Sequence, residues 1–241
     1  MNAVRLIPFF LRHLLPVTPQ FRELRAHREE TYRFMAELRD TLARDAVDDL
    51  AIPSYTHGNP LMRHLFWARL AVALEWLDGL DPRPSAVMDF GCGAGVLFGA
   101  LGRRGMHVVA CDIRPEVAAA GARSSGVTDI DIVDAAGGLA EVAAQSLEVI
   151  LALDVLEHVE DVRQLAGEFA RILTPEGRLL CSLPTENALY RLGRRLAGFS
   201  GHYHVKRPAD VVAELSTRFR VRRMGRLYSF LPLFDFFEAQ T

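Results

Sequence analysis

Hydrophobic and polar positions repeat with one period up to about residue 80 and with another beyond it. In residues 21–45 and 59–79, apolar side chains recur every three or four positions between polar ones, which predicts amphipathic helices. Asn59 and Pro60 suit the N-cap and the first turn of the second helix. We therefore expect the chain to begin with a helical extension over residues 1–80.

From residue 81 the pattern changes to short apolar runs that alternate with helical patterns. Such alternation is typical of a parallel sheet covered by helices on both faces. The expected strands are residues 85–91, 107–112, 129–134, 147–154 and 178–184, followed by 219–224 and 226–234, which could pair as antiparallel strands at the sheet edge. The expected helices are residues 96–104, 116–124, 139–145, 162–173, 187–196 and 209–215. We predict an α/β domain over residues 81–241 with a doubly wound, mostly parallel sheet.

Three glycines, Gly91, Gly93 and Gly95, follow the first expected strand directly. Open α/β sheets bind ligands at this carboxyl edge, where glycine permits positive φ and a close approach of ligand to main chain. The dinucleotide fingerprint would require a third glycine at the position of Val96, and the Lys-Ser/Thr pair of a phosphate loop is absent. The pattern that is present is Asp-x-Gly-x-Gly-x-Gly over residues 89–95.

The run VMDFGCGAGVL at residues 87–97 resembles the first motif of class I S-adenosylmethionine-dependent methyltransferases. Residues 147–184 resemble the fourth strand, the following helix and the turn into the fifth strand of that family, and the similarity extends over about residues 85–230. The chain is similar to the type found in ubiquinone-biosynthesis O-methyltransferases. The resemblance implies a Rossmann-like fold with a seven-stranded sheet, and S-adenosylmethionine as cofactor.

The same resemblance assigns two aspartates to the cofactor. Asp112 closes the second expected strand and would bind the ribose hydroxyls, since charge-assisted hydrogen bonds are roughly twice as strong as neutral ones. Asp134, after the third strand, would reach the adenine amino group. The full set of cofactor-binding residues that we expect is Asp89, Gly91, Cys92, Gly93, Gly95, Asp112, Ile113, Asp134, Ala135 and Leu153.

The acceptor site is expected beyond the ends of the fourth and fifth strands. Methyl transfer needs an acceptor held close to the methyl group and, for a hydroxyl, a group that takes up its proton. Histidine suits that role because its pKa lies near 6.5. The candidate catalytic residues are His158, His202 and His204.

A second interpretation makes this region a metal site. Asp154, Glu157 and His158, with His202 or His204, could hold Mg²⁺, which would acidify the acceptor. Positions 154, 157 and 158 would converge on one helical turn. The string resembles the E-x-x-E-H pattern of metal-dependent relatives, with Asp154 in place of the first glutamate. A third interpretation gives Glu157 and His158 a role in the fold alone.

The helices before residue 80 and the loop IPSYTHGNP, residues 52–60, are predicted to cover the acceptor as a lid. Tyr55, His57 and Asn59 would line the acceptor pocket, or else the loop only caps the following helix. Apolar stretches near both ends and scattered arginines favour a lipophilic, quinone-like or natural-product acceptor that is methylated at oxygen. The arginines at 191–195 and 218–223 are expected to be solvated, with contact to an anionic lipid or substrate as the alternative.

Bulk composition limits the alternatives. The 241 residues carry a formal net charge of −2, which does not favour a nucleic-acid partner. Other readings are an RNA or protein methyltransferase, a non-catalytic cofactor-binding partner and a nicotinamide oxidoreductase.

Three widely spaced cysteines indicate reduced thiols and a cytoplasmic location. The apolar N-terminus has no recognisable cleavage site, and no run reaches the ~18 apolar residues of a membrane span. We expect it to be a helix packed on the domain or a peripheral membrane contact.

Overall fold

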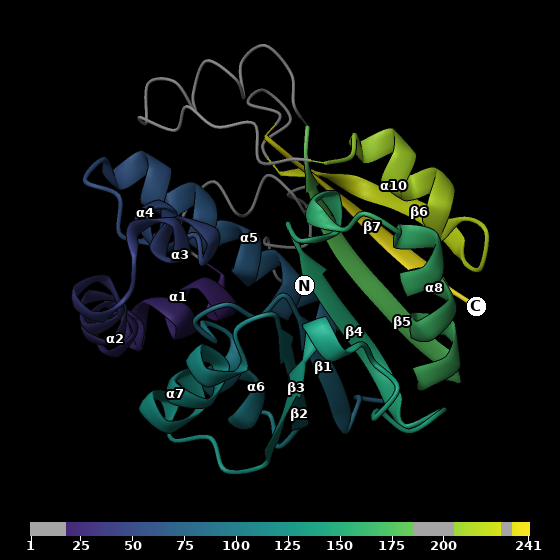
Figure 1. Cartoon of the computed structure of the whole chain (residues 1–241), viewed down its shortest axis with the longest axis horizontal. Helices are drawn as coiled ribbons and strands as arrows, with labels where there is room; N and C mark the ends of the chain where they lie inside the picture. Colours follow the sequence, from purple (N-terminus) through teal and green to yellow (C-terminus); the bar gives the residue numbers. More distant parts are fainter. Residues whose placement is uncertain (1–17, 186–204, 228–232) are drawn as a thin grey trace, which may run out of the picture. The chain divides into compact units, whose positions relative to one another are not determined.

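The computed structural model describes residues 18–185, 205–227 and 233–241. They form two compact units, within residues 18–139 and within residues 140–241. Seven strands make one sheet in the order β3-β2-β1-β4-β5-β7-β6 (Figure 1). The α/β class and the mostly parallel, seven-stranded sheet predicted above are confirmed.

The first unit begins with helices, as predicted. They are α1 (Pro19–Ala26), α2 (Arg28–Thr41), α3 (Arg44–Asp49), α4 (Ile52–Tyr55) and α5 (Pro60–Asp78). The side chain of Asn59 accepts a hydrogen bond from the Leu61 amide at 2.9 Å and Pro60 opens α5, which confirms the predicted cap.

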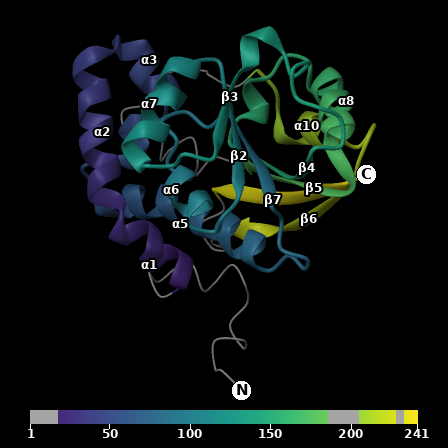
Figure 2. The same ribbon diagram turned by 90° about the horizontal axis from the view of Figure 1, so that it is seen from below.

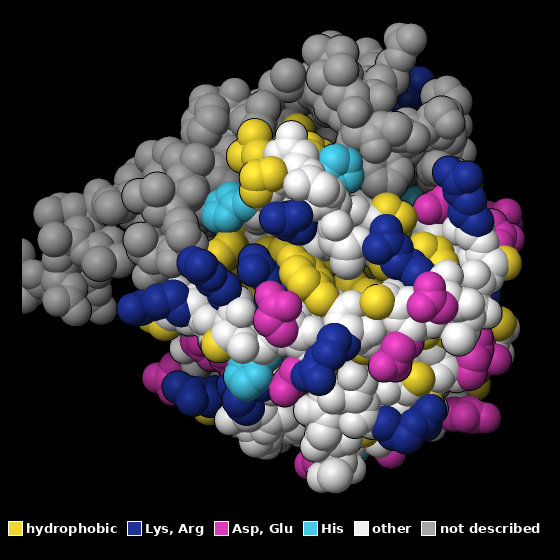
Figure 3. Space-filling view, turned by 90° about the vertical axis from the view of Figure 1, so that its left-hand side faces the viewer, with side chains coloured by type: hydrophobic (Ala, Val, Ile, Leu, Met, Phe, Trp, Pro, Cys, Tyr) yellow, Lys and Arg dark blue, Asp and Glu magenta, His cyan; other side chains and the backbone are white. Residues whose placement is uncertain are grey.

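Figure 3 shows a face of the molecule on which charged side chains, many of them Lys and Arg, surround a band of hydrophobic ones.

The rest of the first unit is a parallel β–α arrangement. Its elements are β1 (Ala86–Phe90), α6 (Phe98–Gly102), β2 (His107–Asp112), α7 (Pro115–Ser125), β3 (Ile130–Asp134) and the 3-10 turn η3 (Ala135–Gly137). β2 lies between β1 and β3, and both pairs are parallel. Asp112 is the register partner of Asp134, so these two carboxylates end their strands at the same level of the carboxyl edge.

The second unit holds the other half of the sheet. Its elements are β4 (Leu147–Leu153), the 3-10 turn η4 (Leu156–His158), α8 (Val162–Ile172), β5 (Leu173–Pro184), α10 (Pro208–Leu215), β6 (Arg220–Leu227) and β7 (Phe234–Gln240). β4 and β5 are parallel, and β7 runs antiparallel to both β5 and β6. Figure 2 shows β6 as the outermost of these strands, beyond β7.

Two predicted elements were wrong, one in its type and the other in its position. Residues 139–145 form turns instead of a helix, because Gly138 before them has φ +82° and Gln145 has φ +52°. Leu139 and Val142 fit a helical spacing, yet they are buried as anchors of a loop. The last strand lies at Phe234–Gln240 and not at 226–234, because Arg226 and Leu227 still belong to β6.

The remaining expectations concern segments that the structure leaves undescribed. The predicted N-terminal helix and the predicted helix at 187–196 lie outside the described residues. Within the described ranges, no helix combines the length and the apolar character that a membrane crossing requires.

Candidate functional site

The loop after β1 is built on glycines in the left-handed region. Gly91, Gly93 and Gly95 have φ values of +72°, +53° and +71°, as the motif predicts. The loop turns over the end of β2, where the amides of Gly91 and Cys92 both donate to the Cys111 carbonyl oxygen at 2.8 and 3.3 Å. The carboxyl end of β1 therefore opens into a fixed concave backbone.

Two of these glycines are required for different reasons. A Cβ on Gly95 would lie 2.3 Å from ring carbons of Phe98, so internal packing alone demands glycine there. A Cβ on Gly93 would meet Leu50 no closer than 3.7 Å, so that position has room beside it. Within the protein, the positive φ is therefore the reason for glycine at 93, since a Cβ there would make only an ordinary contact with Leu50.

Asp112 connects this loop to the end of β2. Its Oδ2 accepts a hydrogen bond from the Gly93 amide at 2.8 Å, and its Oδ1 accepts one from the Arg114 amide at 3.0 Å. The residue is 8% exposed. Each carboxylate oxygen has a further lone pair, so Asp112 can shape the loop and still accept both hydrogens of a vicinal diol.

The neighbouring positions are arranged for a flat, partly polar group. Ile113 follows Asp112 and is 65% exposed, which is high for a large aliphatic side chain in the described chain. Asp134 ends β3 beside it, is exposed, and caps η3 by accepting from the Ala136 amide at 2.9 Å. Two carboxylates with an apolar side chain between them match the hydroxyls, amino group and ring of a nucleoside.

Asp89 adds a buried negative charge in β1. Burial, with the nearby Asp112 carboxylate, raises the pKa of Asp89 to about 7, and Arg69 acts in the opposite direction. Arg69 is buried on α5, where it donates to the Tyr55 hydroxyl at 2.7 Å and lies over the Phe66 ring. Carboxylates that disfavour each other's charge provide a suitable environment for a cationic ligand.

Two cysteines near the loop are inert in the described structure. Burial raises the pKa of the Cys111 thiol to about 12 and that of Cys92 well above its ordinary value. Both are thus protonated near neutral pH and unsuited to act as nucleophiles. Cys92 serves the loop as a small, buried side chain.

The structure accounts for all three predicted acceptor residues of the lid by contacts inside the first unit. Tyr55 is 7% exposed and accepts the bond from Arg69. His57 Nδ1 accepts from the Asn59 amide at 3.0 Å, and Asn59 caps α5. A role for them in acceptor binding stays a prediction.

In the second unit, Asp154 directly follows β4 and has a left-handed backbone conformation, with φ +54°. Its amide donates to the Ser182 carbonyl oxygen at 3.0 Å, and its Oδ1 accepts the Ser182 hydroxyl hydrogen. Non-glycine residues in this region cost about 1–3 kcal/mol and cluster at functional sites. Leu153, the predicted cofactor contact just before it, is half-buried at the end of β4. Ser182, on β5, was missed by sequence analysis because no motif marks it.

Asp154, Glu157 and His158, the predicted metal ligands that the structure describes, do not form a group that could hold a metal ion. Glu157 is 1% exposed, and its carbonyl oxygen accepts from the amides of Val205 and Lys206 at 2.9 and 3.1 Å. His158 is exposed on the same 3-10 turn. In the described part of the chain, no three His, Cys, Asp or Glu side chains form a group that could hold a metal ion. His202 and His204 lie outside the described residues.

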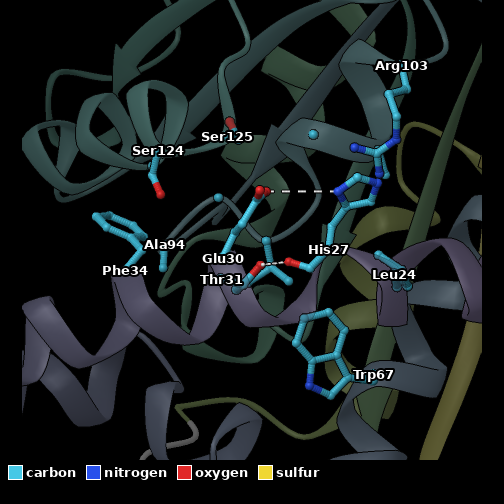
Figure 4. Close-up of a pocket in the computed structure, with 15 residues that line it drawn as sticks. Leu24, His27, Glu30, Thr31, Phe34, Trp67, Ala94, Arg103, Ser124 and Ser125 are labelled. Carbon is cyan, nitrogen blue, oxygen red and sulfur yellow. Dashed lines mark hydrogen bonds and ion pairs between the residues drawn. The ribbon is translucent and has the colours of Figure 1, made fainter.

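A separate groove lies in the first unit, between α1–α2 and α6–α7 (Figure 4). Phe34 and Trp67 contribute aromatic rings, and an ion pair joins His27 Nδ1 to Glu30 at 3.9 Å. The groove shares Ala94, Gly95 and Val96 with the glycine loop, but Asp112 and Asp134 do not line it. It is therefore distinct from the group formed by Asp112, Ile113 and Asp134 at the strand ends.

Comparison with known proteins gives the same domain type. Residues 88–181 match the family described as a methyltransferase domain. A ubiquinone biosynthesis O-methyltransferase of Paracidovorax citrulli is 33% identical over 120 residues, covering 48% of this chain and 50% of that protein. The protein of the same name from Xanthomonas axonopodis pv. citri is 32% identical over 158 residues, covering 60% and 66%. The chain thus spans about half, and at most about two thirds, of the length of these relatives.

Solved structures share the fold at low sequence identity. The PH0226 protein of Pyrococcus horikoshii OT3 has a TM-score of 0.60 and 19% identity, covering 78% of this chain and 95% of that one. Magnesium protoporphyrin IX methyltransferase from Synechocystis PCC 6803, with bound SAH, has a TM-score of 0.58 and 20% identity, covering 86% and 99%. The matched domain, the relatives and the glycine–aspartate geometry support a class I S-adenosylmethionine-dependent methyltransferase domain in this chain, and the solved structures share its fold.

Proposed function

We propose that this protein transfers the methyl group of S-adenosylmethionine to an oxygen atom of a small, lipophilic acceptor of the quinone or natural-product kind. The observation that carries the proposal is Asp112, whose two oxygens each accept one backbone hydrogen bond and keep a lone pair for a diol. The relatives named above are ubiquinone biosynthesis O-methyltransferases, which favours oxygen and a quinone-like acceptor.

The first unit would bind and orient the cofactor. S-adenosylmethionine, when bound, supplies an electrophilic methyl group on a sulfonium. Asp112 would accept from its ribose hydroxyls, Ile113 would lie against the adenine ring and Asp134 would accept from the adenine amino group. The absence of side chains at Gly91 and Gly93 would let the ligand approach the main chain of the loop. Asp89 would add negative charge near the cationic part of the ligand.

The proton of the acceptor hydroxyl requires a base in the protein. His158, His202 and His204 are our candidates, because a histidine that is neutral near pH 7 can accept a proton. Asp154 would orient or polarise the acceptor, with its carboxylate held by Ser182. The left-handed backbone of Asp154 and the bond from Ser182 together hold this carboxylate in a fixed position.

The chain outside these residues would complete the active site. We propose that residues 1–80 form the lid over the acceptor site on a methyltransferase domain of residues 81–241, and that Tyr55, His57 and Asn59 face the acceptor after closure. Three buried, free cysteines support a reducing, cytoplasmic location.

The first experiment is calorimetric titration with S-adenosylhomocysteine of the wild type, Asp112→Ala and Asp112→Asn. We expect binding in the wild type and a loss of at least about 100-fold in Asp112→Ala, because two charge-assisted bonds disappear. Glu141→Ala, at an exposed position, is the matched control and should bind like the wild type. Absence of binding in the wild type would refute the transferase proposal.

The acceptor class needs a separate experiment. Incubation with S-adenosylmethionine that carries a labelled methyl group, against a panel of catechols, hydroxyquinols and prenylated phenols, followed by mass spectrometry, locates the new methyl group. We expect the label on oxygen and a preference for acceptors with an apolar tail. Label on carbon or nitrogen, or transfer to RNA or protein alone, would overturn the proposed reaction. Repeating the assay with a chelator tests the metal alternative.

A further inference from the structure

One edge of the sheet in the second unit is open and strongly basic. Among the residues that the structure describes, β6 pairs with β7 and with no other strand (Figure 2). The outer side of such an edge strand presents backbone N–H and C=O groups without strand partners. It can accept a further strand unless its side chains prevent this.

Arginines project from both faces of this edge. Arg222 lies opposite Glu238 of β7, and Arg226 lies opposite Asp235. Asp235 and Glu238 are three positions apart on one strand, so their side chains point to opposite faces of the sheet. The arginines paired with them therefore lie above and below the outer edge.

The cluster carries more positive charge than its carboxylates neutralise. Glu238 pairs with Arg222 and, at 2.8 Å, with Arg178 of β5. Asp235 pairs with Arg223 at 2.7 Å and with Arg226 at 2.8 Å.

Arg218 and Arg220 are exposed and form no ion pair with any residue in the described ranges. Together, six arginines and two carboxylates leave a formal charge of +4, in a chain whose net charge is −2. Arg178 lies on β5, beyond β7, so we call the other five arginines with the open side of β6 the basic edge.

Charge limits what can occupy the basic edge. A second copy of the chain, paired edge to edge, would bring arginines against arginines, which is unfavourable. An anionic membrane or a nucleic acid could neutralise the arginines but would leave the row of backbone groups hydrogen-bonded to water alone. An acidic extended peptide satisfies both the charges and the backbone.

β7 shows one such pairing on the inner side of β6, with a register shift between Arg223 and Gly225. It runs antiparallel to β6, and its carboxylates at positions 235 and 238 reach arginines directly opposite and diagonal to them. The side chain of Arg222 is still 70% exposed and that of Arg223 is 49% exposed. Each guanidinium has five N–H donors, so they retain donors for a second strand on the outer side.

We propose that the basic edge binds an acidic, extended segment of another protein, which adds to β6 as an antiparallel strand and places its carboxylates among the arginines. The favoured segment repeats the spacing of β7, with two acidic residues three positions apart between β-branched or aromatic residues. This inference is independent of the methyl-transfer proposal, because it uses no residue assigned to cofactor or acceptor.

The test measures fluorescence polarisation with a labelled ten-residue peptide that has Asp-x-x-Glu spacing on a Thr/Val background. We expect saturable binding to the full chain that weakens with added salt. A peptide with both acidic residues changed to lysine should bind at least about tenfold more weakly. A peptide that keeps its charges but is N-methylated at alternate residues on one edge should weaken equally, because it cannot complete the ladder of hydrogen bonds.

Protein variants locate the site. Arg218→Glu with Arg220→Glu should reduce peptide affinity at least about tenfold. Their melting temperature and S-adenosylhomocysteine affinity should be unchanged, because both side chains are exposed and outside the described ion pairs. Arg123→Glu, exposed on α7, is the matched control and should keep full peptide affinity.

Three outcomes would overturn the inference. The N-methylated peptide could bind as well as its parent, which would make the basic edge a charged surface without strand addition. Vesicles of phosphatidylglycerol or a polyuridine RNA could bind more tightly than the peptide, with loss in the Arg218→Glu, Arg220→Glu variant. Finally, the acidic peptide could show no binding to the wild-type chain.

Discussion

The two ends of β2 and β3 carry carboxylates in opposite electrostatic settings. At the amino ends, His107 Nδ1 pairs with Asp129 at 2.7 Å and His107 Nε2 with Asp131 at 3.3 Å, all at the surface. At the carboxyl ends, Asp112 and Asp134 are bonded to backbone amides, not to a cationic side chain, in the described contacts. The amino end is satisfied by the protein itself, whereas the carboxyl end keeps capacity for a ligand.

Buried Asp89 makes the contrast stronger. It lies near Asp112, and even with Arg69 nearby its pKa is raised to about 7. At the amino end, by contrast, the hydrogen bond to Asp129 raises the pKa of His107, which favours the ion pair. Neighbouring carboxylates such as Asp89 and Asp112 are unfavourable, and proteins tolerate them where function requires them. The electrostatics thus distinguish the candidate site at the carboxyl ends from the structural ion pair at the amino ends.

The largest effect is expected from Asp89→Asn. Because the folded pKa of Asp89 is raised above its unfolded value, the folded state holds an extra proton between about pH 4 and pH 7. The free energy of unfolding of the wild type should therefore fall as pH rises through this window, by roughly 2–4 kcal/mol. Chemical denaturation at pH 5, 6, 7 and 8 measures it.

Asp89→Asn should remove most of this fall and be more stable than the wild type at pH 8. Its affinity for S-adenosylmethionine should also be lower, because the variant lacks a negative charge near the cation. Equal pH slopes in wild type and variant would show that Asp89 is not the group that titrates, and would weaken the contrast between the two strand ends.

The second effect separates two glycines within the loop. Gly95→Ala places a Cβ 2.3 Å from the Phe98 ring and should destabilise the fold by about 2–3 kcal/mol. Gly93→Ala has room beside it and should cost only about 1–2 kcal/mol for its positive φ. Thermal unfolding together with S-adenosylhomocysteine titration distinguishes them, since Gly93→Ala should lose more affinity than its stability change explains. Similar losses of stability in both variants would contradict this assignment.

The cofactor half of the site was predictable because it depends on local backbone and strand register. Glycines in a loop after a strand predict positive φ, as found at Gly91, Gly93 and Gly95. Parallel pairing of the strands then brings Asp112 and Asp134 to the same level. Arg69 was not predictable as a partner, since α5 precedes the strands and nothing local marks this arginine as buried.

The acceptor half and parts of the fold depend on distant contacts. Ser182 meets Asp154 across 28 positions, and no spacing rule indicates that pair. The helical spacing of Leu139 and Val142 suggested a helix, but left-handed residues at 138 and 145 produced turns. Local patterns thus indicated the element types reliably in the core strands and failed where a loop buries apolar anchors.

The third effect tests whether strain at Asp154 serves function. Asp154→Gly removes the energetic cost of a left-handed non-glycine residue but also removes the hydrogen bond with Ser182. The two effects oppose each other, so the free energy of unfolding should change by no more than about 1 kcal/mol. Methyl transfer should fall at least about tenfold with unchanged S-adenosylhomocysteine affinity. Asp154→Asn tolerates the same φ and is the control for backbone effects. Full activity in Asp154→Gly would reduce this residue to a structural one.

The smallest effect on stability is expected from His107, at the amino ends of β2 and β3. His107 has a raised pKa, so its stabilisation is fully present below its unfolded value near pH 6.5 and is lost as pH rises through the folded pKa. Because the cluster is exposed, His107→Gln should cost less than about 1 kcal/mol at pH 6 and still less at pH 9. Affinity for S-adenosylhomocysteine should stay unchanged at both pH values. A loss of affinity would mean that the two strand ends are coupled, and their electrostatic settings could then no longer be treated as separate.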